Sequence, residues 1–158
     1  MIRCITILFL LLHLGCQGDL QSSRPTTSTG LHVVCTTGMV ADLARNIAGS
    51  HLQISQLMKA GVDPHLYKAT PSDVQLLSHA DLILYSGHHL EGKLAEVLHQ
   101  LQKTRKCVGV TEHIPAEKLL RTSEGGVNAH LWFDVSLWKL AAQEVQKPLQ
   151  ALDPAHEA

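Results

Sequence analysis

Histidine is the residue type best placed to do chemistry in this sequence, which holds 11 of them among 158 residues. A neutral imidazole is the commonest protein ligand for transition-metal ions. Most histidines are solvated loop residues, so their positions must identify any that bind. His65 follows Asp63-Pro64, where the fixed φ angle of proline stiffens the loop. His130 precedes the apolar run Leu131-Trp132-Phe133. We therefore predict that His65 and His130 are metal ligands.

The neighbours of these two histidines have more than one possible role. Asp63 either orients the ring of His65 or caps a turn. Trp132 and Phe133 either anchor and dehydrate the site or pack into the core, and the two roles are compatible. Both segments are thus expected to support the ligands that they flank.

The elements that must position these ligands alternate along the chain. Short apolar runs typical of strands occupy residues 31–36, 52–57, 82–85 and 107–110. Helical spacing of apolar residues occurs at residues 39–48, 71–78, 90–101 and 134–152. This alternation predicts an α/β fold: an open, parallel, four-stranded sheet in the order 2-1-3-4, with helices on both faces.

Ligands of such sheets bind beyond the carboxyl ends of the strands. Three further histidines, His88, His89 and His113, follow predicted strands and should lie at the same edge as His65 and His130. Glu112, His113 or His89, or water, are candidates to complete the coordination of a metal.

The N-terminus has the pattern of an export signal. Residues 5–14 form a ten-residue apolar run, which is short for a membrane span and typical of a signal peptide. Leu14-Gly15-Cys16 then resembles a lipoprotein cleavage site, although an ordinary signal with an incidental cysteine is the alternative. We predict a signal peptide at 1–16 with Cys16 as the lipid acceptor, and a flexible tether at 17–30. The protein should be exported to the periplasm or cell surface and anchored to the membrane.

Other classes of function find little support. The net charge of −1 gives no electrostatic reason to expect nucleic acid. Nucleotide-binding glycine loops and CxxC pairs are missing from the sequence. Cys35 and Cys107 lie in apolar strand patterns and are expected to be buried free thiols.

Several stretches together resemble the TroA-like (cluster A-I) metal receptors of ABC transporters. The most specific are GVDPHLYKAT at 61–70 and HLWFDVSLW at 130–138, and the resemblance covers residues 31–152. It implies two α/β lobes joined by one long helix, with His65 and His130 as the ligands of the first lobe. It also implies capture of zinc, manganese or iron, an ABC permease and its ATPase as partners, and no enzymatic activity.

The chain departs from that family in three ways. Asn128 and Ala129 stand where many relatives have Asp-Pro, so a less rigid loop is expected before His130. The short segment 121–128 lacks a histidine-rich acidic insertion, which favours manganese, iron or broad specificity. The sequence is also about half the family's length.

We therefore assign residues 31–133 to the first lobe and 134–158 to the start of the inter-lobe helix. The second lobe is expected to be absent from this chain, and a separately encoded lobe is one way to supply it. Without that lobe, the apolar face of the last helix, including Trp138 and Leu149, should be partly exposed.

Two alternatives to a metal receptor remain. One is a truncated, non-transporting fragment that binds metal weakly. The other is a metal-dependent hydrolase, which would need an acid or base beside the metal, and Glu112 is its only candidate.

Overall fold

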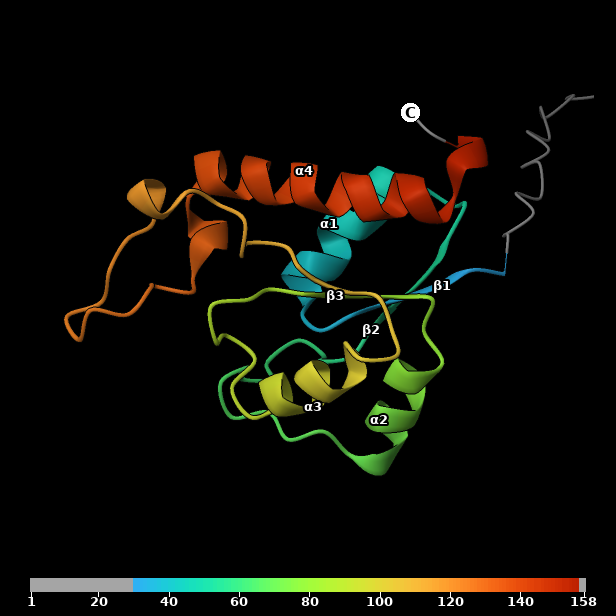
Figure 1. Ribbon diagram of the computed structural model, residues 1–158, viewed down its shortest axis with the longest axis horizontal. Helices are drawn as coiled ribbons and strands as arrows, with labels where there is room; N and C mark the ends of the chain where they lie inside the picture. Colours follow the sequence, from blue (N-terminus) through green and yellow to red (C-terminus); the bar gives the residue numbers. More distant parts are fainter. Residues whose placement is uncertain (1–29, 157–158) are drawn as a thin grey trace, which may run out of the picture.

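Four parallel strands form the centre of the computed structural model, which describes residues 30–156 (Figure 1). They are β1 (His32–Cys35), β2 (Gln53–Gln56), β3 (Leu82–Tyr85) and β4 (Cys107–Gly109). The strands pair in the order β2-β1-β3-β4. The predicted topology is confirmed.

Helices cover both faces of this sheet, as predicted (Figure 1). One face carries α1 (Gly38–Ala48) and α4 (Val135–Leu152), and the other carries α2 (Pro71–Ser78) and α3 (Leu94–Leu101). Short 3-10 turns occur at η1 (Ala116–Lys118), η2 (Leu131–Phe133) and η3 (Pro154–His156). The third helix starts four residues later than the expected residue 90, because a turn with several positive φ angles precedes it.

The alternation of side chains along β3 divides the core into two layers. Leu82 and Leu84 pack with residues of α1 and α4, whereas Ile83 and Tyr85 pack with residues of α2 and α3. Since successive strand residues point to opposite faces, one short buried strand supplies apolar side chains to both layers. Apolar packing on both faces therefore stabilises the sheet, whose carboxyl edge carries the histidines.

Helix α4 is more deeply packed than the sequence analysis expected. Leu149 is only 4 % exposed and belongs to the core beneath α1, and Trp138 packs partly buried against the same core. The expectation of a partly exposed apolar face is wrong for Leu149, because α4 packs on α1 and its apolar side chains join the core on that face of the sheet. Asp134 caps the helix by accepting hydrogen bonds from the backbone N–H groups of Ser136 and Leu137.

The predicted signal peptide with Cys16, and the tether as far as residue 29, lie outside the described residues. Within residues 30–156, none of the helices combines the length and the hydropathy needed to cross a bilayer.

Replacement of Leu149 by alanine tests the packing of α4. Leu149→Ala should lower the free energy of unfolding by about 2–5 kcal/mol, because it leaves a cavity in the core. Val135→Ala, at a position 82 % exposed on the same helix, should change it by less than about 0.5 kcal/mol. Urea denaturation followed by circular dichroism measures both values, and equal losses would show that α4 is not packed as described.

Candidate metal site

The two predicted ligands meet, although they stand 65 positions apart in the sequence. His65 lies in the loop between β2 and α2, and His130 immediately precedes η2. Their Nε2 atoms are 3.4 Å apart, and their ring centroids are 5.3 Å apart at an interplanar angle of 53°. In Figure 1 the orange segment that leads into η2 lies on the left, at the same end of the molecule as the loop that follows β3. Both side chains are exposed, so a metal ion can reach them from solvent.

The distance between the two nitrogens suits a shared metal ion. Zinc binds imidazole nitrogen at about 2.0–2.1 Å with tetrahedral geometry, which places two such nitrogens about 3.3–3.4 Å from each other. The Nε2 atoms of His65 and His130 are 3.4 Å apart. The pair therefore has the spacing of one edge of a tetrahedral site.

Asn128 sets the protonation pattern of the His130 ring. The backbone N–H of His130 donates to Oδ1 of Asn128 over 3.1 Å, which identifies that atom as the amide oxygen. The same oxygen lies 2.8 Å from Nδ1 of His130, and it can only accept, so Nδ1 must carry the hydrogen. In the neutral ring the lone pair is then on Nε2, which faces His65. Asn128 was expected to leave a less rigid loop, whereas its two hydrogen bonds restrain the ligand.

The loop that carries His65 is restrained on both sides of the ligand. Before it, Oδ1 of Asp63 accepts a hydrogen bond from the backbone N–H of His65 over 2.9 Å, so of its two possible roles Asp63 caps a turn. After it, the hydroxyl of Tyr67 donates to Oδ2 of Asp73 over 2.7 Å. Asp73 also accepts from the backbone and hydroxyl of Thr70 in the capping box of α2.

Asp73 keeps its charge because of these contacts. Burial alone would raise the pKa of its carboxyl group, but the hydrogen bonds from Thr70 and Tyr67 outweigh burial and hold the pKa below its usual value. A charged acceptor makes the stronger hydrogen bond, so the segment after His65 is tied firmly to α2.

The three apolar residues after His130 have different environments. Leu131 is 3 % exposed and packs in a small apolar cluster beneath the start of α4. The Trp132 ring lies beside His130, with centroids 5.2 Å apart and an interplanar angle of 56°. Phe133 is 80 % exposed, so the expectation that it packs in the core is wrong. Because η2 is a tight 3-10 turn, its residues face different environments, and of the three only Leu131 is fully buried.

The expected auxiliary ligands do not join the pair. Among the described residues, no group of three His, Cys, Asp or Glu side chains is arranged to hold a metal ion. His89 and Glu112 instead line a separate cavity of about 520 Å³, where Oε2 of Glu112 accepts a hydrogen bond from the Tyr85 hydroxyl over 3.0 Å. Glu112, His113 and His89, which were candidates alongside water to complete the coordination, thus do not gather with the pair in this structure. A shared sheet edge is wide enough to separate side chains that follow different strands.

The two described cysteines are free, and Cys35 is buried while Cys107 is partly buried. Burial raises the pKa of Cys35 to about 12 and that of Cys107 to about 11. Neither thiol belongs to a metal-ligating group of three or more side chains among the described residues.

The fold of this chain is found in a known protein family. The family profile described as "ZnuA: Zinc-uptake complex component A periplasmic" matches residues 33–158. The chain belongs to this family.

Curated relatives agree with this assignment. A manganese-binding lipoprotein, MntA, from Bacillus subtilis is 41 % identical over 143 residues, which are 90 % of this chain and 46 % of the relative. The zinc-binding protein TroA of Treponema pallidum is 47 % identical over 122 residues, which are 77 % of this chain and 40 % of the relative. The chain thus spans about half the length of the curated relatives it matches, or slightly less.

Solved structures show the same fold. The periplasmic zinc-binding protein TroA from Treponema pallidum superposes with a TM-score of 0.78 at 44 % identity, covering 81 % of this chain and 46 % of that one. A cadmium-bound periplasmic metal-binding protein from Candidatus Liberibacter asiaticus gives a TM-score of 0.72 at 30 % identity, covering 80 % and 47 %. The predicted α/β fold class and the family resemblance are confirmed.

The role of Asn128 is open to a direct test with two substitutions. Asn128→Ala removes the acceptor for Nδ1 of His130 and should weaken zinc binding by about 10- to 100-fold, because the ring loses its preferred tautomer. Asn128→Asp keeps an acceptor at the same place and should bind zinc at least as tightly as the parent protein. Isothermal titration calorimetry measures the three affinities. Equal affinities for the alanine variant and the parent protein would show that Asn128 does not orient the ligand.

Proposed function

We propose that this chain takes part in the extracytoplasmic capture of a divalent transition metal for an ABC importer, with His65 and His130 as ligands. The single observation that supports this most directly is the 3.4 Å separation of the two Nε2 atoms, which suits one metal ion. The metal is the transported cargo, and no catalytic step is involved.

The relatives support a transition metal as cargo. Their names describe one as manganese-binding and another as zinc-binding, and solved relatives hold cadmium or manganese. Zinc, manganese and iron are therefore the candidate cargoes of this chain. Imidazole suits zinc and iron, whereas manganese prefers more oxygen ligands, so the ligands beyond His65 and His130 should decide between these metals.

We further propose that residues 31–133 are the first lobe of such a receptor and that residues 134–158 begin the inter-lobe helix. A closed zinc site needs four ligands, so two imidazoles form half of one. In this proposal a second lobe, encoded separately or in a longer form of the chain, supplies the other half. An ABC permease and its ATPase are the expected partners.

A weakly binding fragment without transport activity is the second candidate. It is favoured by one observation: within residues 30–156, no third His, Cys, Asp or Glu side chain joins the pair in a metal-binding group. A hydrolase has no comparable support, because Glu112 lines a different cavity and is hydrogen-bonded to Tyr85.

Calorimetry on four histidine variants tests the site. His65→Ala and His130→Ala should each nearly eliminate the binding of zinc and manganese, since each removes one of only two ligands. His99→Ala, at an exposed position on α3, and His79→Ala, at the end of α2, should leave binding close to that of the parent protein. Binding should also weaken on acidification, because protons compete with the metal for imidazole.

Equal losses in all four variants would mean nonspecific chelation by surface histidines, and the proposed site would be wrong. A molar ratio of one metal ion per chain, abolished only by the two loop substitutions, is the expected result.

We also propose that Cys16 carries a lipid that anchors the protein to the membrane. Relatives named as lipoproteins support this proposal. Cys16→Ala should abolish labelling by a radioactive or clickable fatty acid and release the mature protein from the membrane fraction. Cys107→Ala, within the folded lobe, is the matched control and should remain labelled and membrane-bound. Unchanged labelling in the Cys16 variant would contradict the anchor.

A further inference from the structure

The turn between β3 and α3 has an unusual backbone. Gly87, His88, His89 and Gly92 all have positive φ angles, of 103°, 49°, 62° and 47°. The left-handed region is costly for residues with a Cβ atom, and two adjacent histidines adopt it here. Such conformations persist only where the surrounding structure holds them in place, and they often occur beside functional sites.

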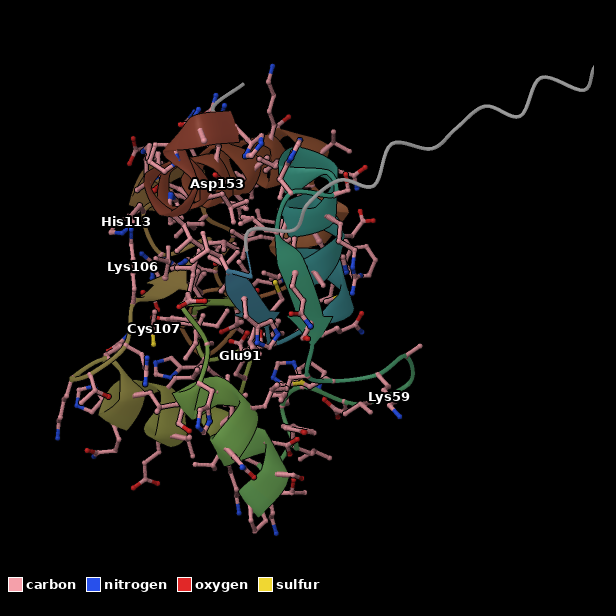
Figure 2. The ribbon with its side chains drawn as sticks, turned by 90° about the vertical axis from the view of Figure 1, so that its right-hand side faces the viewer. Lys59, Glu91, Lys106, Cys107, His113 and Asp153 are labelled. Atoms are coloured by element: carbon pink, nitrogen blue, oxygen red, sulfur yellow. The ribbon has the colours of Figure 1, made fainter. Side chains whose placement is uncertain are left out.

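Glu91 holds this turn in place. Its side chain is 1 % exposed, and Figure 2 shows it inside the molecule, between the sheet and the helices below it. Its Oε1 accepts hydrogen bonds from the hydroxyl of Thr36 over 2.8 Å and from the backbone N–H of Ser86 over 2.5 Å. Its Oε2 accepts from the backbone N–H of Gly87 over 3.2 Å. A buried carboxylate with three donors thus ties the turn to the end of β1 and fixes the next residue, Gly92.

Gly92 is in direct contact with the backbone of the ligand His65. A Cβ atom added to Gly92 would lie 2.0 Å from the carbonyl oxygen of His65, 2.7 Å from its carbonyl carbon and 3.1 Å from its Cα. These are backbone atoms, so they cannot rotate away as the end of a side chain would. Any side chain at position 92 must therefore displace the His65 loop by on the order of 1 Å to restore ordinary contact distances.

Other glycines with positive φ differ from Gly92 in this respect. Gly61 and Gly125, with φ of 82° each, have no atom within 4 Å of an added Cβ. At Gly49, with φ of 58°, the nearest such atom belongs to the side chain of His51, at 3.9 Å. At these three positions glycine is needed only for the positive φ angle. At Gly92 the missing Cβ also lets the backbone of His65, a proposed metal ligand, come close.

We propose that Gly92 is a positioning residue for the metal site. Because Gly92 has no Cβ atom, the His65 loop can pack closely on the β3–α3 turn, and the hydrogen bonds of Glu91 hold that turn in place. The distance between Nε2 of His65 and Nε2 of His130 then follows from that packing. This inference rests on the proposed function. Metal ligands must be held within about 0.5 Å of their productive positions, so a displacement of about 1 Å is enough to impair the pair.

The test compares Gly92→Ala with Gly49→Ala. Both variants place alanine at a positive φ angle, so both should lose stability in urea denaturation, and Gly92→Ala should lose more because its Cβ also meets the His65 backbone. Only Gly92→Ala should lose the nuclear Overhauser effect between the imidazole rings of His65 and His130 in the metal-free protein. It should also bind zinc at least about tenfold more weakly than Gly49→Ala in calorimetry, and gain less thermal stability from added zinc.

A third variant keeps the test decisive if Gly92→Ala does not fold. Glu91→Asp shortens the carboxylate by one methylene and loosens the turn without adding atoms at position 92. It should weaken both the ring-to-ring Overhauser effect and zinc affinity, in the same direction as Gly92→Ala.

The outcomes separate the two proposals. If Gly92→Ala, or Glu91→Asp in its place, keeps the Overhauser effect and the zinc affinity of the Gly49→Ala control, the positioning role is overturned. If the parent protein and Gly49→Ala show the Overhauser effect, Gly92→Ala loses it, and none of them binds zinc, the metal function fails while the positioning of His65 by Gly92 is upheld.

Discussion

The approach of two imidazole nitrogens to 3.4 Å is the interaction on which the rest of the site depends. Two lone pairs at that distance repel each other unless a proton or a metal ion lies between them. Asn128 fixes the lone pair of His130 on Nε2, so in the metal-free protein a hydrogen on Nε2 of His65 is needed to make the contact favourable. In the proposed function a metal ion takes the place of that hydrogen. In the proposed metal site the two rings are thus already close together before a cation binds, which reduces the cost of binding.

The surrounding structure holds these two rings in place, and it does so through contacts between distant segments. The His65 loop is capped by Asp63, tied to α2 by Tyr67, and packed on the turn that contains Gly92. His130 is held by Asn128 and by the burial of the adjacent leucine beneath α4. Because α4 packs on α1 with Leu149 buried, residues 30–156 have their own core, and contacts within these residues position the two histidines.

The sequence predicted much of the fold, and it singled out His65 and His130, whose rings the structure brings together. Alternating strand and helix patterns indicated a parallel sheet, whose carboxyl edge is the usual place for a ligand. Proline before His65 and the apolar run after His130 distinguished these two histidines from the others. These signals are local, so they can be read from residue types and spacing alone.

The burial and grouping of side chains depend on distances between remote segments, so only the tertiary structure could decide them. It placed Leu149 in the core and left Phe133 exposed, and it put Glu112 in a different cavity from the two ligands. It also showed that Asn128 orients a ring and that Gly92 admits the His65 backbone. The sequence alone determined that this chain is an α/β lobe with two candidate imidazole ligands. Only the folded chain decided which of the candidate side chains lie together, because that depends on ångström-scale packing between loops that lie far apart in the sequence.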